Sequence, residues 1–425
     1  MRILLLSQFY PPIVGGEERH VRNLAAALAE RGHNVVVATL WYPGAAPIER
    51  DGEVVVYRIR GTLQRLSWLF AESERRHAPP FPDPELVFGL KRVIAKEQPD
   101  VVHAHNWLVA SFLPLKRHYR LPLVVTMHDY GLSCARKNLM RDGALCSGPR
   151  LAKCLSCSAA HYGSVKGAIT TIANMALGLL LRRIGDMFIP VSRAVARHTA
   201  LARARVPFEV IHNFIPNDIG AADPGAEARQ PDLPGGDYIL FVGDVTATKG
   251  VHVLLKAYAS LNEAPPLVLI GRRCGDAPAE LPPNVRLLAP RPHAAVMQAW
   301  RDCLFGVVPS TGPEACATVV MEAMACGKAL IGTDIGGTPD LITHGTTGIV
   351  VPPGDSAALA AAMERLLDRP DLRADLGAAG AARVEALKAR AIVPRIERVY
   401  EQVIGASRRV DVAAQAAALI QRSRS

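Results

Sequence analysis

The sequence lacks a hydrophobic run long enough to cross a lipid bilayer. A membrane-spanning helix needs about 18 or more consecutive apolar residues, whereas the longest candidate run, residues 167–181, is interrupted by Asn174 and followed by two arginines. The first residues, Met1–Gln8, are too few and become polar too soon for a signal peptide, so we expect them to form a first core strand. Both absences favour a cytoplasmic protein.

Aromatic residues are also scarce, at 5% of the chain, and no nucleic-acid recognition motif is present. The net charge of +10 lies in residues 1–220, which hold 28 Lys/Arg against 17 Asp/Glu, whereas residues 221–425 hold 21 and 22. The basic half would attract an anionic membrane surface or an anionic, lipid-linked acceptor, which would make the protein peripheral on the inner face of the membrane. Nucleic acid is disfavoured because its binding sites interleave aromatic with basic residues. An ordinary solvated basic surface is the alternative.

A chain of 425 residues is too long for one ordinary core, so two or three domains are expected. Short apolar runs alternate with longer helical patterns, which indicates an α/β protein with doubly wound parallel sheets. The strands expected in the first half are Arg2–Leu6, Asn34–Thr39, Val54–Ile59, Val101–His103, Leu123–Met127 and Met187–Pro190. The first helix is expected at Glu17–Arg31, with Gly32 as its stop signal.

A second alternating series begins after residues 214–236, a segment rich in Pro, Gly, Ala and Asp that is expected to be a linker. Its expected strands are Tyr238–Val242, Leu267–Ile270, Leu304–Val308 and Ala329–Ile331, and its expected helices are Val251–Leu261 and Ala294–Arg301. Two doubly wound domains that face each other would place a ligand at the carboxyl ends of both sheets.

The pair Glu314 and Glu322 is the most informative feature of the chain. Glu314 follows an apolar strand and a Pro/Ser/Gly turn, and Glu322 lies eight residues further on, in an expected helix. Eight residues span just over two helical turns, so both carboxylates can face one crevice, and the amides of the helix N-terminus favour an anion such as a diphosphate. Two acceptors for sugar hydroxyls beside an anion site indicate a nucleotide-sugar pocket. Two solvated glutamates on an amphipathic helix are the alternative.

The stretch around these glutamates resembles the E-x7-E motif of family 4 retaining glycosyltransferases, which have the GT-B fold. Further matching pieces occur in the family's order between residue 2 and about residue 355. They are Gly15-Gly16, Asp100 to His105, Thr126 to Asp129, Val191 to Arg193, His212-Asn213, Phe241 to Gly243, Lys249-Gly250, Gly336 to Asp340 and Gly348 to Asp355.

The resemblance implies two Rossmann-like domains that face a central cleft. The acceptor-binding domain would comprise residues 1–213, with a Cys-rich insertion at 130–163, and the nucleotide-sugar-binding domain residues 237–389. Residues 390–425 would form a helix that crosses back to the first domain, followed by a tail. The implied activity is metal-independent transfer of a hexosyl group from a UDP- or GDP-linked sugar to a saccharide or lipid-linked saccharide. Such transfer would serve surface polysaccharide or glycoconjugate synthesis and retain the anomeric configuration by front-face displacement.

The resemblance also implies roles for single residues. His128 would approach the donor sugar and Glu314 would contact its hydroxyls, so these two are the catalytic candidates. The donor-binding candidates are Gly15 and Gly16 through their backbone, Lys249 through its charge, Thr318 and Val319 through their amides, Glu322 at the ribose, and Arg272. Asp129 is expected either to orient His128 or to cap the next turn, and either His103 or His105 could point into the acceptor cleft.

The chain departs from the family pattern at Asp244, where an arginine is usual. A carboxylate there would repel a diphosphate, so Arg272 or Arg273 could compensate, or either could lie on the nucleobase side. The usual glycine three residues after Glu314 is replaced by Ala317, which adds a methyl group near the diphosphate.

Four of the eight cysteines fall in the insertion, as Cys134, Cys146, Cys154 and Cys157. Four thiolates in a short polar segment suit a structural tetrahedral zinc, and an iron–sulfur cluster is the alternative. Such a site would shape the acceptor side of the cleft.

Two other functions fit part of these observations. A nucleotide-sugar epimerase could share the fold, and Asp244 raises the alternative of a non-catalytic partner protein.

Overall fold

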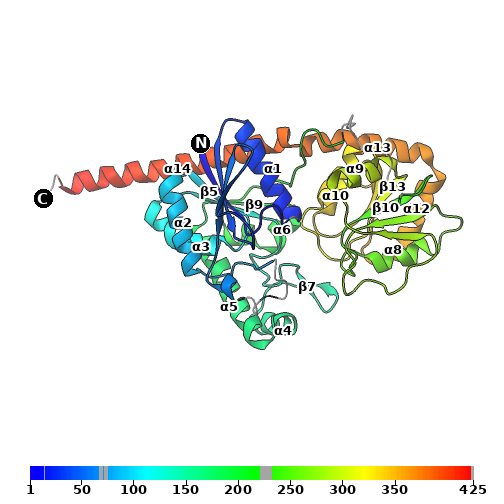
Figure 1. Cartoon of the computed structure of the whole chain (residues 1–425), viewed down its shortest axis with the longest axis horizontal. Helices are drawn as coiled ribbons and strands as arrows, with labels where there is room; N and C mark the ends of the chain where they lie inside the picture. Colours follow the sequence, from blue (N-terminus) through cyan, green and yellow to red (C-terminus); the bar gives the residue numbers. More distant parts are fainter. Residues whose placement is uncertain (14, 67–69, 71–74, 221–231, 423–425) are drawn as a thin grey trace.

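The computed structural model describes residues 1–13, 15–66, 70, 75–220 and 232–422, so residues 221–231 of the expected linker lie outside the described part. Two mainly parallel sheets, each flanked by helices, lie one after the other along the longest axis, and the last helix runs along both (Figure 1). This is the α/β architecture that the alternating sequence pattern predicts.

The first sheet has seven strands in the order β3-β4-β2-β1-β5-β6-β9, and its edge strand β3 runs antiparallel to β4. The strands are β1 (Arg2–Leu6), β2 (Asn34–Leu40), β3 (Ile48–Asp51), β4 (Val54–Ile59), β5 (Val101–Ala104), β6 (Leu123–Met127) and β9 (Met187–Pro190). In the centre, Leu4 pairs with Val36 on one side and with Val102 on the other. These strands are almost wholly apolar because helices cover both faces of the sheet.

Alternating side chains of β1 pack into different cores. Ile3 and Leu5 join a core that contains α1 and α14, whereas Leu4 and Leu6 join a core that contains α2 and α3. The helices of this half are α1 (Gly16–Glu30), α2 (Pro84–Glu97), α3 (Val109–Tyr119), α6 (Arg193–His198), α7 (Leu201–Ala204) and the short η1 (Leu63–Arg65).

The second sheet has six parallel strands in the order β12-β11-β10-β13-β14-β15. The strands are β10 (Ile239–Val242), β11 (Leu267–Ile270), β12 (Val285–Leu288), β13 (Phe305–Val308), β14 (Ala329–Thr333) and β15 (Ile349–Val351). The helices are α8 (Val251–Tyr258), α9 (His293–Asp302), α10 (Thr318–Ala325), α11 (Thr338–Leu341), α12 (Ser356–Asp368), α13 (Pro370–Val384) and η3 (Glu385–Leu387).

Helix α14 (Ala389–Arg422) leaves the second sheet and packs against the first (Figure 1). The buried Tyr400 hydroxyl lies 2.7 Å from Nδ1 of His103 in β5. Glu397 accepts hydrogen bonds at 2.7 Å from the guanidinium of Arg31 and lies 2.7 Å from Nε2 of His33. The backbone remains helical past Ser407, where the weak sequence pattern did not predict structure.

The insertion after β6 contains the hairpin β7 (Met140–Arg141) and β8 (Ala144–Leu145), then α4 (Leu151–Tyr162) and α5 (Ser164–Ile184). The apolar run 167–181 lies inside α5. Within the described residues α5 is the one helix long and apolar enough to cross a membrane by length and composition, although a third of its most apolar window is buried. The interrupted run in the sequence did not indicate a helix of this length.

The expected strands agree with the observed ones to within two residues at each end. Besides the two-residue strands β7 and β8 of the insertion, three strands of the two large sheets were not expected. The edge strand β3 has the sequence Ile-Glu-Arg-Asp and is only partly buried, so it carries no apolar pattern. The other two, β12 and β15, are only four and three residues long.

Candidate active site

Segments that follow the carboxyl ends of strands in the two sheets meet where the two halves contact each other. Three contacts join the halves there. Arg19 of α1 meets Glu322 of α10, the amide of Arg193 donates to Asp340 at 2.7 Å, and Asn213 lies against the carbonyl of Cys316. A cleft at this edge is where an α/β sheet binds its ligand.

Glu314 lies in the loop after β13 and contacts a lysine directly. Its Oε1 is 2.9 Å from Nζ of Lys249, and it also accepts a hydrogen bond from the Ser310 hydroxyl. Burial by itself would raise the pKa of Glu314, but the charge of Lys249 and the hydrogen bonds outweigh it and lower the pKa. Glu314 is therefore held as a carboxylate next to a cation.

The loop that carries Glu314 packs closely against the backbone of Gly336 and Gly337. The Gly337 amide donates to the Glu314 carbonyl at 2.7 Å, and Gly336 has a φ of +62°. A Cβ at Gly336 would lie 2.2 Å from the same carbonyl oxygen. Glycine at this position thus allows the backbone to pass directly beneath Glu314.

Glu322 is buried in α10 and has two partners. Its Oε1 accepts from Nη1 of Arg19 at 3.0 Å and lies 2.9 Å from Nε2 of His293. Its side chain thus lies on the side of α10 that faces α1 of the first half. The first helical residues of α10, Thr318 and Val319, follow Ala317, whose side chain provides no cap. Their amides remain oriented for an anion.

The negative charge of Asp244 is paired with a positive one. Its carboxylate accepts a hydrogen bond from Nη2 of Arg272 at 2.8 Å. Both side chains are largely exposed, so the pair contributes little to stability. Its consequence is electrostatic, because Arg272 offsets the negative charge that replaces the usual arginine.

Gly15 and Gly16 begin α1, which enters the cleft from the first sheet. Gly15 is the N-cap, and no side chain caps the helix there. A Cβ at Gly15 would lie 2.5 Å from a carboxylate oxygen of Glu18, whereas one at Gly16 would meet no atom within 4 Å. Open space above Gly16 is compatible with a ligand lying against this backbone.

Four histidines form a layer at the carboxyl ends of β5 and β6. Nδ1 of His105 lies 3.0 Å from Nε2 of His128, and the ring of His20 from α1 packs edge-on against that of His128. His103 is fully buried between Tyr400 and Thr126, with both ring nitrogens at 2.7 Å from a hydroxyl, so it has a structural role. Burial lowers the pKa of His128 to about 4 and that of His103 to about 3, which keeps both rings neutral.

Asp129 caps the turn after β6 and does not bond to His128 in the described structure. Its Oδ1 accepts from the Gly131 amide at 2.6 Å, and its Oδ2 lies 3.7 Å from Nζ of Lys137. The neighbouring Glu17 of α1 accepts a hydrogen bond from Asn106. Burial raises the pKa of Glu17 to about 8, so this carboxyl carries a proton at neutral pH.

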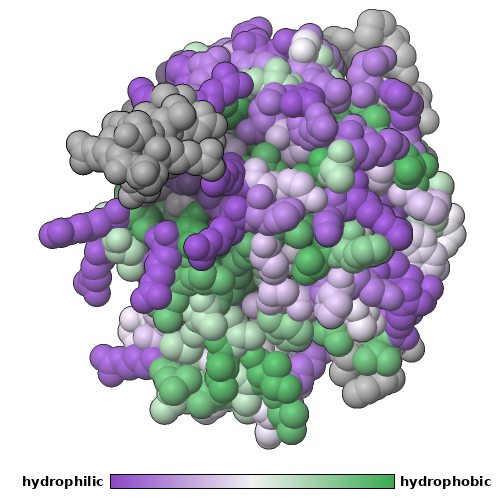
Figure 2. All heavy atoms as spheres, turned by 90° about the vertical axis from the view of Figure 1, so that its left-hand side faces the viewer, coloured by the Kyte–Doolittle hydropathy of each residue, from purple (hydrophilic) through white to green (hydrophobic). Residues whose placement is uncertain are grey.

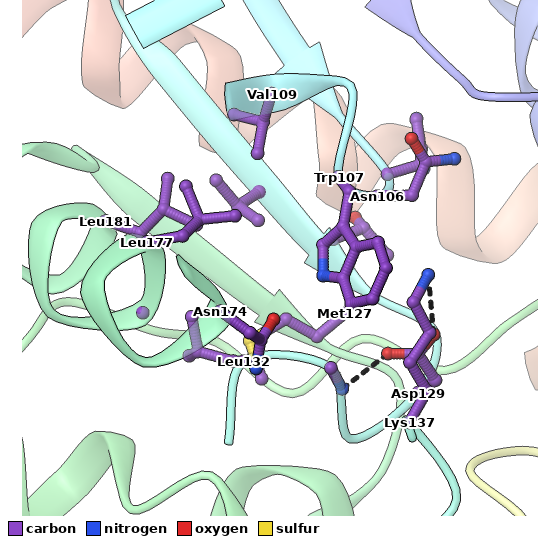
Figure 3. Close-up of a pocket in the computed structure, with 15 residues that line it drawn as sticks. Asn106, Trp107, Val109, Met127, Asp129, Leu132, Lys137, Asn174, Leu177 and Leu181 are labelled. Atoms are coloured by element: carbon purple, nitrogen blue, oxygen red, sulfur yellow. Dashed lines mark hydrogen bonds and ion pairs between the residues drawn. The ribbon is translucent and has the colours of Figure 1, made fainter. Parts of the chain in front are cut away.

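A cavity of about 40 Å³ lies beside these groups (Figure 3). His105, Asn106, Trp107, Asp129 and Lys137 line it from the strand ends, and Asn174 lines it from α5. Nζ of Lys137 lies 4.2 Å from the centre of the Trp107 ring. The buried indole nitrogen of Trp107 has no hydrogen-bond partner among the described residues, so it is free to donate to a ligand.

The four cysteines of the insertion, Cys134, Cys146, Cys154 and Cys157, line one small cavity of about 30 Å³. In the described part of the chain, a single group of three His, Cys, Asp or Glu side chains has its ligand atoms within 4.8 Å of one another, and it comprises His20, His105 and His128. The cysteine sulfurs are therefore not close enough, as they stand, to share one ion.

Several residues at this site were not identified from the sequence. Arg19 and His293 contact Glu322, Ser310 contacts Glu314, and Glu17 and Asn106 lie at the acceptor side. Their positions depend on how the two halves meet. Among them, only Glu17 and Arg19 lie close in the sequence to predicted site residues, since both come shortly after the Gly15-Gly16 pair.

Two doubly wound units with an E-x7-E pair, a lysine and an uncapped helix N-terminus at their facing carboxyl ends define a GT-B glycosyltransferase. The model of Glycosyltransferase Family 4 matches residues 14–218, and that of Glycosyl transferases group 1 matches residues 226–383. The chain belongs to glycosyltransferase family 4. This assignment supports the transferase prediction over an epimerase or a non-catalytic partner.

Relatives and solved structures agree with the assignment. The chain is 29% identical over 400 residues to a glycogen synthase of Mycobacterium tuberculosis, with 87% of each chain covered. It is 27% identical to a phosphatidyl-myo-inositol mannosyltransferase of the same species, over 97% of this chain and 100% of that one. The structure of sucrose-phosphate synthase from Thermosynechococcus elongatus matches with a TM-score of 0.75 at 22% identity, covering 95% and 99% of the two chains. The GT-B fold is thereby confirmed.

Proposed function

We propose that this protein transfers a hexosyl group from a UDP- or GDP-linked sugar to a hydroxyl of a saccharide or lipid-linked saccharide, with retention of configuration. The observation that carries the proposal is the contact between Glu314 and Lys249, next to the N-terminus of α10. A carboxylate for sugar hydroxyls, a cation and uncapped amides are the groups that a sugar diphosphate requires.

The donor would lie across the second sheet. Its ribose would replace Arg19 or His293 as a partner of Glu322, its diphosphate would meet Lys249 and the amides of Thr318 and Val319, and Glu314 would bind the sugar hydroxyls. In the transfer step the bond between the anomeric carbon and the diphosphate oxygen breaks. The acceptor oxygen bonds to that carbon on the same face, and the acceptor proton passes to the departing diphosphate. Lys249 and the helix N-terminus stabilise the negative charge that develops there.

The acceptor would enter from the first sheet. The cavity beside His105 offers an indole face and donor at Trp107, an amide at Asn106 and a cation at Lys137. Aromatic faces bordered by amides and charged groups suit a saccharide and an anionic linkage. The mannosyltransferase relative, whose name specifies a phosphatidyl-inositol acceptor, supports a lipid-linked substrate for this chain too. The excess of basic residues in the first half supports a peripheral contact with an anionic membrane.

Thermal-shift measurements with a panel of UDP- and GDP-sugars test the donor assignment. We expect one donor and its nucleoside diphosphate to stabilise the protein. Transfer is then assayed with saccharide and lipid-linked acceptors, and the anomeric configuration of the product is read by NMR. No stabilisation by any nucleotide, or a product of inverted configuration, would refute the proposal.

A structural zinc at the insertion is a separate part of the proposal. What supports it is that Cys134, Cys146, Cys154 and Cys157 all line one cavity in a segment with little core of its own. Binding would require the thiols to turn towards the cavity, since sulfurs around zinc lie about 2.3 Å from the ion. Elemental analysis of protein purified without chelator should give about one zinc per chain, while visible absorption would identify iron–sulfur. Protein without any metal would reject the site.

A further inference from the structure

Helix α5 has its polar and apolar sides largely reversed relative to a helix that packs on a core. Its inner side buries Gly167, Thr171, Asn174 and Gly178, which are small or polar, together with two leucines, Leu177 and Leu181. The outward side carries Val165, Ile169, Ile172, Leu179 and Leu180, which are 43–76% exposed. These five residues, named here the α5 face, lie within about 100° of the helix circumference and extend over about 22 Å along its axis.

Close packing explains why two positions on the inner side, Gly167 and Gly178, cannot hold a larger residue. A Cβ at Gly167 would lie 2.6 Å from the backbone of Ser158 in α4, and a Cβ at Gly178 would lie 2.6 Å from the Leu132 carbonyl oxygen. Thr171 donates to the Ser158 hydroxyl at 2.8 Å. The inner side is thus filled by protein, whereas the apolar side chains of the outer side remain 43–76% exposed.

The segment of the chain that carries the α5 face has charge of one sign. Between Gly143 and Gly185 the sequence contains no Asp or Glu, while Arg150, Lys153, Lys166 and Arg183 are among its cations. Figure 2 shows hydrophobic side chains gathered at the lower end of the molecule, where Figure 1 places α4 and α5, with hydrophilic side chains projecting nearby. An apolar helix face bordered by Lys and Arg is the pattern of a helix that lies in the interface of an anionic membrane.

A groove of about 1050 Å³ continues from the same helix. Leu180 and Ile184 of α5 line it together with Leu113, Arg117 and Arg120 of the α3 region. The one carboxylate in its lining, Asp186, is paired with Lys116 at 2.7 Å. Apolar walls next to guanidinium groups fit a lipid chain with an anionic headgroup.

We infer that the α5 face inserts into the headgroup region of an anionic bilayer and holds the catalytic cleft next to a membrane-bound acceptor. The inference rests on the proposed lipid-linked acceptor. The inner side of α5 contributes Asn174, Leu177 and Gly178 to the wall of the acceptor cavity (Figure 3), so one helix joins the membrane to the site.

Two other arrangements fit the structure less well. A membrane-spanning α5 would have to leave α4 and place the buried, polar Asn174 in hydrocarbon, which is costly. A dimer through this face would bring two segments without carboxylates, each rich in cations, against one another, and like charges across an interface repel.

Flotation with vesicles of phosphatidylglycerol and phosphatidylcholine tests the inference. The wild-type chain should bind these vesicles and stay partly bound in about 1 M NaCl, where screening limits charge attraction to about 3 Å. The triple variant Ile169→Gln, Ile172→Gln, Leu179→Gln should require about tenfold more lipid for half-binding, because the apolar area that enters the interface is lost. The matched control Ile48→Gln, Phe88→Gln removes equally exposed apolar side chains elsewhere and should bind as wild type.

A second variant, Leu179→Trp, tests insertion even if the triple variant does not fold. Its tryptophan fluorescence should shift to the blue when vesicles are added. Unchanged binding of the triple variant, or no blue shift, would overturn the inference. It would also be overturned if the wild type did not bind vesicles but formed a dimer that the triple variant lost. If the α5 face binds vesicles but the protein transfers sugar to no lipid-linked acceptor, the membrane contact is supported and only the proposed acceptor is refuted.

Discussion

Arg19 and Glu322 lie 303 residues apart in the sequence and meet across the cleft, with Nη1 of Arg19 at 3.0 Å from Oε1 of Glu322. Arg19 belongs to α1 of the first half, and Glu322 belongs to α10 of the second. Glu322 is the proposed ribose partner, so a donor must compete with Arg19 for the same carboxylate. Arg19 therefore occupies a position on Glu322 that the ribose of the donor would take.

We predict that Arg19→Ala lowers the melting temperature of the free protein, since the buried Glu322 carboxylate loses a charge-assisted hydrogen bond equivalent to about 1.5–3 kcal/mol. The same variant should show a larger stabilisation by the nucleoside diphosphate, because the competing contact is gone. Thermal shift with and without nucleotide measures both effects. The control is Arg22→Ala, which changes a residue of the same helix and removes an exposed ion pair between that residue and Asp51. It should leave the nucleotide shift unchanged. A smaller shift in Arg19→Ala would mean that Arg19 helps to bind the donor.

Lys249→Ala and Glu322→Ala should each weaken binding of the nucleotide donor. Each loses a charge-assisted hydrogen bond, which is equivalent to about 1.5–3 kcal/mol. Isothermal titration calorimetry measures the loss. Lys256→Ala, an exposed lysine of α8, removes the same charge at a distance from Glu314 and should bind as wild type. Unchanged affinity in both site variants would refute the placement of the donor.

Glu314→Gln should lower kcat and leave nucleotide affinity nearly unchanged. The amide preserves the shape of the side chain but removes the charge that Lys249 and Ser310 hold in place. Steady-state kinetics and nucleotide titration on the same preparation separate the two effects. A large loss of nucleotide affinity with wild-type kcat would assign Glu314 to the nucleotide and not to the sugar.

The histidine layer should make the fold sensitive to acid. Burial lowers the pKa of His103 to about 3 and of His128 to about 4, against an ordinary value of 6.5. Between those values the unfolded chain binds protons that the folded chain does not, so stability is full above pH 6.5 and falls as the pH drops towards 3. Each unit of lowered pKa corresponds to about 1.4 kcal/mol.

Melting temperatures measured between pH 7.5 and pH 4.5 (about the range in which an unfolded histidine gains its proton) should therefore fall more steeply for the wild type than for His103→Gln. Glutamine cannot gain a proton but can still bond to the Tyr400 hydroxyl. His118→Gln, on the surface of α3, is the control and should keep the wild-type slope. Equal slopes in all three proteins would contradict a neutral buried layer.

The sequence by itself determined the strands and the pair of glutamates. Buried parallel strands leave continuous Val, Ile and Leu runs, and a strand, turn and helix in succession place Glu314 and Glu322 on one side. The other segments that match the family, including those that contain Lys249 and His128, can likewise be recognised from short stretches of sequence. Short or charged strands such as β3 lack such a pattern and were missed.

Only the tertiary structure decided what those residues contact. The pairing of Arg272 with Asp244, of Arg19 with Glu322 and of His103 with Tyr400 joins positions that no local pattern connects, because each depends on how helices and sheets pack. The reversal of α5 has the same origin. Its composition is that of an apolar helix, but the requirement for small residues against α4 and Leu132 decides which side is buried and leaves the apolar side facing out.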